Sequence, residues 1–410
     1  MKEIYMDHSS TTYVDKRALE AMQPYFSDIY GNPSSFHSVG KLAKDAVESS
    51  REKIAKIIGS KIDEVIFTAG GTESNNLAIL GYARANKEKG NHLITQKTEH
   101  HSVLEAMEHL EKKEGFKVMY LGVDEYGTVD PAAVEAAITK ETLLVSIMYA
   151  NNEIGTIQSI AEIGKIVEAK KKEFGSALRF HVDACQAAGS LEMDVNKLHV
   201  DLMTANGSKM YGPKNVGMLY IKSGIKLQPL MFGGPQERTL RPGTENVPGI
   251  VGFARAFELA QTEKEAENAR LMMIRDRLIT GILQTIPKSI LNGHPTNRLP
   301  NNVNISILDI EGEAFVLYLD AKGVCASTGS ACTSASLDPS HVIIATGLPY
   351  EAGHGSLRLT LGKRNTMEDA EHVISILPEI VEKLRAISPV NLDMKHYIRS
   401  VQRGAFSVQK

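Results

Sequence analysis

Short apolar runs alternate with longer amphipathic segments through the first half of the chain. Between the runs, apolar positions recur every three or four residues, which predicts helices over residues 41–58, 103–113 and 160–174. The apolar runs themselves have the length of β-strands. They cover residues 64–68, 92–95, 117–121, 143–149, 178–182, 200–203 and 217–221. This alternation predicts an α/β fold with a mostly parallel, seven-stranded sheet between helices.

The second half of the chain has a different pattern. A long charged helix is predicted over residues 249–285, and two further strands are predicted near 302–308 and 356–361, with helices between and after them. These elements predict a smaller α+β domain. We expect four parts: an N-terminal segment that joins the small domain (1–15), a large domain (16–258), the small domain (259–387) and a mobile or partner-docking tail (388–410).

Composition narrows the class of protein. The 410 residues are 42% hydrophobic, enough for well-buried cores, and the net charge of -3 with mixed signs predicts no nucleic-acid surface. This charge distribution is more consistent with a small-molecule substrate than with a nucleic-acid partner. Three cysteines predict no disulfide framework, and the first residues lack the apolar core of a signal peptide. Both features lead us to expect a cytoplasmic protein. Since no apolar run reaches the roughly 18 residues that a membrane span needs, we expect no membrane partner.

Lys209 is the strongest candidate for chemistry. It lies on a turn of small residues directly after an apolar strand, and Gly207, Gly212 and Pro213 impose an unusual backbone path around it. Upstream, Asp183 ends another apolar run. An amine of this kind suits a Schiff base, and a strand-end carboxylate can pair with a pyridinium nitrogen, so the pair predicts pyridoxal phosphate. The alternatives are a solvated loop lysine and a helix-capping aspartate.

Three other predicted strand ends carry candidate residues. Gly70, Gly71 and Thr72 open a helix whose free N–H groups could hold a phosphate, with an ordinary capping turn as the alternative. His100 could lie flat on a cofactor ring or simply cap a helix. Asn152 could bind a phenolic oxygen or a carboxylate. Because strand carboxyl ends share one crevice, we expect these residues to lie near Lys209.

Residues 325–336 form a second candidate site. Small residues surround Cys332, which suits an attacking thiolate, whereas Cys325 follows an apolar residue and is expected to be buried. Cys185 is expected to pack in the core. The cysteines lack companions at zinc-ligand spacing, so no metal site is predicted. Arg358, on a predicted strand, could clamp a carboxylate or form a structural salt bridge.

Together these residues resemble the cysteine desulfurases, pyridoxal-phosphate enzymes of the class V aminotransferase group with fold type I. The resemblance covers nearly the whole chain, and the long cysteine loop resembles the branch that serves iron–sulfur assembly and tRNA thiolation. The segments that carry it are residues 7–12, 70–76, 98–100, 151–155, 181–186, 209–214, 241–244 and 330–334.

The resemblance implies a role for each matching residue. Lys209 would bond to the aldehyde of pyridoxal 5'-phosphate, Asp183 would pair with its ring nitrogen, and His100 would stack on its ring. Cys332 would carry a persulfide. The remaining implied contacts are Gln186 with the phenolic oxygen, Gly71 and Thr72 with the phosphate, Asn152 and Arg358 with the substrate carboxylate, and Thr244 with the phosphate of the other subunit in a homodimer.

The sequence departs from the family at the phosphate. The family usually has a serine two residues upstream of a histidine that precedes the lysine, whereas Asn206 and Ser208 stand at these positions here. Both side chains can donate hydrogen bonds to a phosphate, but no imidazolium charge is available, so we expect looser retention of the cofactor.

The implied activity converts L-cysteine to L-alanine and passes the sulfur from Cys332 to an acceptor protein, such as an iron–sulfur scaffold or a tRNA-thiolation enzyme. One alternative is selenocysteine lyase or another class V pyridoxal-phosphate activity, which would use the same Lys209 and Asp183. The other alternative is a scaffold in a sulfur-transfer assembly.

Overall fold

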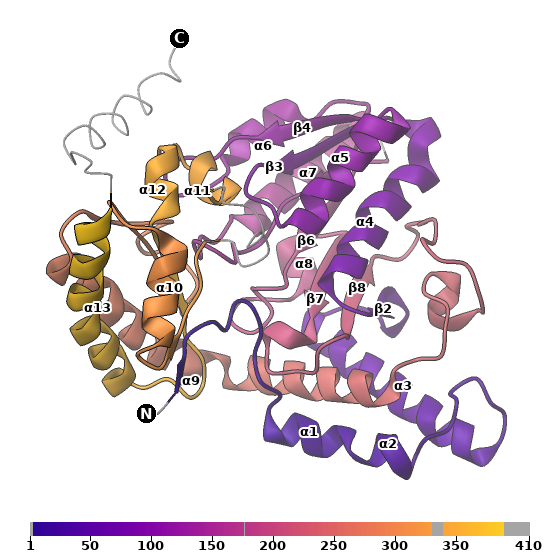
Figure 1. Ribbon diagram of the computed structural model, residues 1–410. Helices are drawn as coiled ribbons and strands as arrows, with labels where there is room; N and C mark the ends of the chain where they lie inside the picture. Colours follow the sequence, from indigo (N-terminus) through magenta and orange to yellow (C-terminus); the bar gives the residue numbers. More distant parts are fainter. Residues whose placement is uncertain (1–2, 176, 330–338, 389–410) are drawn as a thin grey trace.

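The structure, a computed structural model, describes residues 3–175, 177–329 and 339–388 (Figure 1). In this part of the chain a seven-stranded sheet forms the centre of the large body. Its strands are β2 (Val65–Thr68), β3 (His92–Gln96), β4 (Lys117–Leu121), β5 (Thr142–Ser146), β6 (Arg179–Asp183), β7 (Leu202–Asn206) and β8 (Gly217–Ile221).

The sheet is mostly parallel. Its strand order is β2-β8-β7-β6-β5-β3-β4, and β4, β3, β5, β6 and β7 run parallel to one another. The strand β8 is antiparallel to both β2 and β7, so the six other strands all point the same way. The predicted fold class is therefore confirmed, with one reversed strand inside the sheet.

Helices cover both faces of this sheet, as the strand alternation requires. In β7, for example, Met203 and Ala205 pack into the core beneath one set of helices, while Leu202 packs into the core on the other side. The first face meets α3 (Ser38–Ile58), α6 (Pro131–Ala137), α7 (Ile160–Phe174), α8 (Val195–Leu198) and the beginning of α9 (Val247–Thr285). The second face meets α4 (Gly71–Asn86) and α5 (His101–Glu114).

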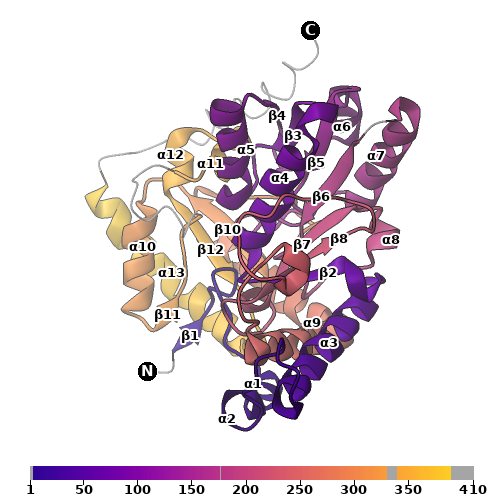
Figure 2. The same cartoon turned by 90° about the vertical axis from the view of Figure 1, so that its right-hand side faces the viewer.

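A smaller body lies beside the large one (Figure 2). Its core is made by the three-stranded sheet β12-β10-β9 and by α10, α13 and the second half of α9. The bounds of its elements are β9 (Ser289–Leu291), β10 (Asn302–Ile307), α10 (Gly312–Asp320), β11 (Val324–Cys325), α11 (His341–Ala345), α12 (Tyr350–His354), β12 (Ser356–Thr360) and α13 (Met367–Ile387).

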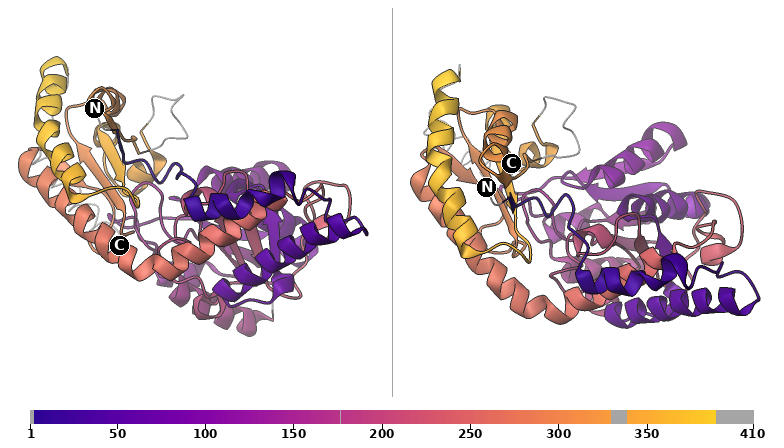
Figure 3. Two further views of the ribbon diagram at one scale, coloured as in Figure 1. Left: turned by 90° about the horizontal axis from the view of Figure 1, so that it is seen from below. Right: turned by 60° about the horizontal axis from the view of Figure 1, so that its bottom comes forward.

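Two segments join the two bodies. The helix α9 runs from one core to the other, with Phe253 buried in the large core and Leu278 in the small one (Figure 3). The N-terminal strand β1 (Ile4–Tyr5) pairs in parallel with β11, and the chain then continues past α1 (Lys16–Met22) and α2 (Pro24–Ser27) into the large body. The residues between β1 and α1 therefore lie where the bodies meet.

Two predicted strands differ from the structure by more than one residue at an end. The run 143–149 ends as β5 at Ser146, and the run 200–203 becomes β7, which begins at Leu202. Val200 is outside the ladder because its N–H donates to the carbonyl of Val195 and closes the turn after α8. No helix in the described ranges is long and apolar enough to cross a membrane.

Candidate functional site

A cavity of about 930 Å³ lies at the carboxyl ends of the parallel strands, where the small body faces the large one. Segments that follow β2, β3, β5, β6 and β7 all contribute to its wall. The predicted site residues that line it are Gly71, Thr72, His100, Asn152, Asp183, Gln186, Asn206, Ser208, Lys209 and Arg358. Residues that are spread over almost three hundred positions of sequence thus meet at one place.

Lys209 enters the cavity from the 3-10 turn η3 (Gly207–Lys209), which follows β7 directly. The turn needs its glycine, because a Cβ atom on Gly207 would lie 2.6 Å from the carbonyl oxygen of Pro213. The Lys209 Nζ donates to the carbonyl oxygens of Ser9 (2.7 Å) and Ser10 (2.5 Å). The amine is therefore held inside the site by backbone acceptors, unlike a solvated loop lysine.

Asp183, the last residue of β6, is held by two donors. Its Oδ2 accepts a hydrogen bond from Asn75 Nδ2 (2.7 Å), and its Oδ1 accepts one from the backbone N–H of Cys185 (2.9 Å). Asn75 Nδ2 also donates to Ser102 Oγ (2.9 Å), and that hydroxyl lies 2.8 Å from His100 Nδ1. One chain of hydrogen bonds thus links the carboxylate to the imidazole.

The protonation of His100 follows from its surroundings. The backbone N–H of Ser102 donates to His100 Nδ1 (3.1 Å), so Nδ1 is an acceptor and the ring proton of the neutral form is on Nε2. Burial lowers the pKa of His100, although the nearby Asp183 opposes this effect. His100 is therefore a neutral imidazole at the cavity wall, and it also caps α5 as the alternative interpretation required.

Gln186 points at the same backbone acceptor as the lysine. Its Nε2 donates to the carbonyl oxygen of Ser9 at 3.0 Å, while Lys209 Nζ donates to that oxygen at 2.7 Å. The amide and the amine are therefore close neighbours. A single ligand could contact both groups at adjacent atoms.

The turn before α4 opens the other end of the cavity. Gly70 has φ 147, a conformation that favours glycine. It precedes α4 without a side-chain hydrogen bond to the helix N-terminus, so an ordinary capping turn does not account for this segment. A Cβ on Gly71 would lie 2.7 Å from Cys185 Sγ and 3.2 Å from Asn206 Nδ2. The helix N-terminus, Thr72 and the Asn206 amide therefore face one region of the cavity, which suits an anion.

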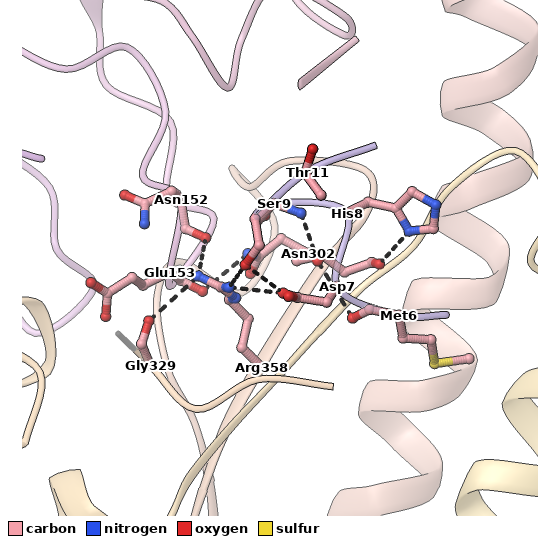
Figure 4. Close-up of polar contacts among 12 residues, drawn as sticks. Met6, Asp7, His8, Ser9, Thr11, Asn152, Glu153, Asn302, Gly329 and Arg358 are labelled. Carbon is pink, nitrogen blue, oxygen red and sulfur yellow. Dashed lines mark hydrogen bonds and ion pairs between the residues drawn. The ribbon is translucent and has the colours of Figure 1, made fainter. Parts of the chain in front are cut away.

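Arg358 on β12 is fully buried and lines the cavity from the side of the small body (Figure 4). Its Nη2 donates to Asp7 Oδ1 (2.9 Å) and to Ser10 Oγ (2.8 Å). Its Nη1 faces the carbonyl oxygens of Asn152 (3.4 Å) and Gly329 (3.5 Å) at longer distances. Arg358 thus forms the predicted structural salt bridge and also lines the cavity.

Sequence reasoning missed two buried carboxyl groups that also line the cavity. Burial, together with nearby Asp183, raises the pKa of Glu99 well above its usual range. Burial raises the pKa of Glu153 to about 7, although Ser340 and Arg358 lower it. Glu99 precedes His100 and Glu153 follows Asn152, so their position beside candidate residues was the signal that could have identified them. Sequence adjacency does not reveal burial, however.

The remaining candidate residues are Thr244 and the three cysteines. Thr244 is exposed and is not part of the cavity wall, and Cys332 lies outside the described residues. Cys325, on the two-residue strand β11, is partly exposed rather than buried. Cys185 was expected in the core, but it lines the cavity, where burial and nearby Asp183 raise the pKa of its thiol.

Comparison with known proteins gives consistent findings. The family model described as Aminotransferase class-V matches residues 4–373. The chain is 54% identical over 389 residues to a "Cysteine desulfurase IscS" of Methanosarcina thermophila, with 95% of this chain and 94% of the relative covered. It is 51% identical to a protein of the same name from Clostridium botulinum, with 95% and 97% covered.

Solved structures agree with these relatives. A structure titled "NIFS-LIKE PROTEIN" matches with a TM-score of 0.87 at 37% sequence identity, covering 93% of this chain and 100% of that chain. The similarity therefore extends over both bodies and the cavity between them.

Proposed function

The chain belongs to the class V aminotransferase family, and we infer from this premise that it is a cysteine desulfurase that depends on pyridoxal phosphate. The observation that carries the inference is the convergence of Lys209, Gln186 and Asp183 on one cavity. The curated relatives named above bear the name cysteine desulfurase and cover almost the whole chain. L-cysteine is therefore the substrate.

The chemical groups that line the cavity match those that pyridoxal phosphate would need for binding. Lys209 offers an amine for the aldehyde, Asp183 a carboxylate for the pyridinium nitrogen, and His100 a neutral ring for stacking. The amide of Gln186 is next to the lysine amine, as a partner of the phenolic oxygen would be. The N-terminal turn of α4, with Gly71 and Thr72, would hold the phosphate together with Asn206 and Ser208.

The chain's own residues would divide the chemical work as follows. When bound, pyridoxal phosphate supplies an electron-withdrawing ring that stabilises negative charge at the substrate Cα. Asp183, fixed by Asn75 and the Cys185 N–H, would keep the ring nitrogen protonated. Lys209 would take the proton from Cα and return protons to the product. Arg358 and Asn152 would orient the substrate through its carboxylate.

Sulfur transfer requires a nucleophile, and we assign that role to Cys332. Its thiolate would attack the sulfur of the bound cysteine, forming an S–S bond as the Cβ–S bond breaks. The electron pair of the broken bond stays with carbon, which is protonated and leaves as L-alanine. The Cys332 persulfide would then be passed to a sulfur-acceptor protein, such as an iron–sulfur scaffold or a tRNA-thiolation enzyme.

Exposed aromatic residues support a homodimer. Phe36 and Phe232 are 106% and 83% exposed, and Tyr30 is 73% exposed. A second cavity is lined by residues from both 33–51 and 235–245, so the two loops that carry these aromatic residues are neighbours. Thr244 is exposed on the same stretch of chain. We propose that a second copy covers this surface and that Thr244 contacts the partner's phosphate there. We also propose a cytoplasmic location, which the low cysteine content supports.

The activity can be tested on the pyridoxal-phosphate-loaded protein. We expect equimolar alanine and sulfide from L-cysteine when dithiothreitol serves as the acceptor, measured by chromatography and by a colorimetric sulfide assay. Cys332→Ala should lose sulfide release, because the raised pKa of Cys185, the thiol that lines the cavity, keeps it protonated and a poor nucleophile. Cys325→Ala is the matched control and should retain it, because this half-exposed thiol on β11 does not line the cavity.

The opposite result has a clear meaning. If Cys332→Ala releases sulfide as fast as the wild type, the thiol mechanism is wrong and a direct lyase becomes the better account. A preference for selenocysteine over cysteine in both proteins would then identify a selenocysteine lyase, which can eliminate selenium without a protein nucleophile.

A further inference from the structure

Glu153 lies between the two bodies and is held from both sides. Its backbone N–H donates to Asn151 Oδ1 (2.8 Å), within the turn that follows β5. Its carbonyl oxygen accepts hydrogen bonds from the side-chain amides of Asn302 and Asn304 on β10, each at 3.0 Å. The residue is 3% exposed, and it lines the cavity together with Arg358. The backbone of Glu153 is therefore fixed at the cavity wall.

Within the part of the chain that the structure describes, the carboxyl group of Glu153 has one neutral donor and one cationic neighbour. The hydroxyl of Ser340 donates to its Oε2, and the charge of Arg358 acts on it from β12. A Cβ on Gly329 would lie 3.1 Å from the same Oε2, so the backbone of this residue is also close. Burial raises the pKa of Glu153 to about 7 despite Ser340 and Arg358. A small electrostatic change can therefore protonate it.

The other titratable groups near Glu153 already have partners of their own. Asp7, on the N-terminal segment, forms an ion pair with Arg358 at 2.9 Å. His341, at the start of α11, is 3.0 Å from the carbonyl oxygen of Glu99 through Nε2, and burial lowers its pKa. The carboxyl group of Glu99 accepts from Met148 N and Gln96 Nε2, and burial with nearby Asp183 raises its pKa, so it carries no charge. Among the described residues, Arg358 is thus the charge that stabilises ionised Glu153.

Binding of a substrate carboxylate changes this balance. The charge of Arg358 would then act on the carboxylates of Asp7 and the substrate and on the buried carboxyl group of Glu153. Like charges in such surroundings are destabilising, and protonation of one carboxyl group is the usual outcome. Asp7 is bonded directly to Arg358, whereas Glu153 is bonded to a hydroxyl. The carboxyl group that becomes protonated is therefore that of Glu153.

We propose that Glu153 takes up one proton from solvent when the carboxylate of the amino-acid substrate binds at Arg358. The inference rests on the proposed function, because it requires a substrate carboxylate at that arginine. Glu153 is then a positioning residue that couples substrate affinity to pH. The KM for L-cysteine rises with pH once Glu153 is ionised in the free enzyme, since binding must then reprotonate it.

The test compares the pyridoxal-phosphate-loaded wild type with Glu153→Gln, which stays neutral at every pH. We expect the KM of the variant to be within about twofold of the wild type near about pH 6, and roughly tenfold lower near about pH 8.5. Calorimetry of L-alanine binding in two buffers of different ionisation enthalpy provides a readout without turnover. At the higher pH the variant should take up about one proton fewer than the wild type.

Glu99→Gln is the matched control, because Glu99 is another buried carboxyl group at the same cavity. Its pKa is raised well above the usual range, so it stays neutral and its removal should leave the proton uptake at the wild-type value. A merely structural role for Glu153 would change KM equally at both pH values and leave proton uptake unchanged. That result would overturn the inference.

Ser340→Ala provides a second route if Glu153→Gln does not fold. Loss of the hydroxyl removes a donor that favours the ionised carboxylate, so the pKa of Glu153 rises. The rise of KM should then begin at higher pH, giving a KM about three- to tenfold lower than wild type near about pH 8.5. An unshifted KM profile would also overturn the inference. Failure to form alanine from cysteine would instead overturn the proposed function itself.

Discussion

At the scale of single residues, Asn206 and Ser208 distinguish this cavity from the pattern usual in its family. The Ser208 hydroxyl lies 3.4 Å from Asn206 Oδ1, and the Ser208 carbonyl accepts from the N–H (2.8 Å) and the hydroxyl (3.1 Å) of Thr12. Both side chains line the cavity, but neither carries a charge. A phosphate there would be bound by neutral donors and the helix end.

We therefore predict that Ser208→His binds pyridoxal phosphate more tightly than the wild type. A hydrogen bond to a charged group contributes about 1.5–3 kcal/mol, so the variant should lose the cofactor roughly tenfold more slowly. The measurement is absorbance of bound cofactor during dialysis, with Asn206→Ser as a control that adds no charge. Equal rates of loss in the wild type and Ser208→His would show that the charge is unimportant here.

At the scale of elements, the junction between β2 and α4 decides how closely a ligand can approach the backbone. Gly70 has a positive φ, and Gly71 contacts the wall formed by Cys185. The carboxylate of Glu73 accepts from the N–H of Ala69 (2.7 Å), so the turn is fixed by its own helix. The turn is therefore rigid and closely packed before any ligand binds.

This packing predicts a pair of compensating substitutions. Gly71→Ala would place a Cβ 2.7 Å from Cys185 Sγ, and overpacking of this kind costs about 1–3 kcal/mol. We expect the variant to bind pyridoxal phosphate roughly tenfold more weakly, measured by fluorescence titration. Adding Cys185→Ala removes the sulfur and should restore most of the affinity, whereas Cys185→Ala alone should have little effect. A double variant as weak as Gly71→Ala would contradict this explanation.

At the scale of the whole molecule, the site depends on two bodies with separate cores. Lys209 and Asp183 come from the large body, whereas Arg358 comes from the small one. The N-terminal segment lies between them and provides the acceptors of Ser9 and Ser10 for Lys209, and Asp7 for Arg358. A change in how the bodies are joined would therefore separate the amine from the arginine.

The exposed aromatic surface gives a prediction at this scale. Phe36→Ser together with Phe232→Ser should weaken the proposed dimer by roughly thirtyfold or more, since central aromatic residues at interfaces contribute about 2 kcal/mol or more. The mass in solution, measured by light scattering after size-exclusion chromatography, checks this. Leu317→Ser on α10 is the control, because this leucine is also exposed but belongs to the small body. A dimer that is unchanged by the two serines would place the interface elsewhere.

The local pattern was sufficient for most elements of the fold. The run 217–221 and the periodic segment 160–174 match β8 and α7 residue for residue, because alternation and helical spacing report directly which side of an element is buried. The direction of β8 was not predictable, since its side chains alternate in the same way in either orientation. Hydrogen bonds to β2 and β7 decide it.

The sequence by itself determined which residues are proposed to carry the chemistry and that they follow strand ends. Parallel strands bring their carboxyl ends to one edge, so Lys209, Asp183 and His100 could be expected to meet. Tertiary structure alone decided the protonation states of Glu99 and Glu153, because burial depends on segments distant in sequence. It also decided that Arg358 pairs with Asp7, more than three hundred residues away. The reactive groups can be identified from short segments of sequence. The burial and charge that set their protonation depend on how the two bodies pack together.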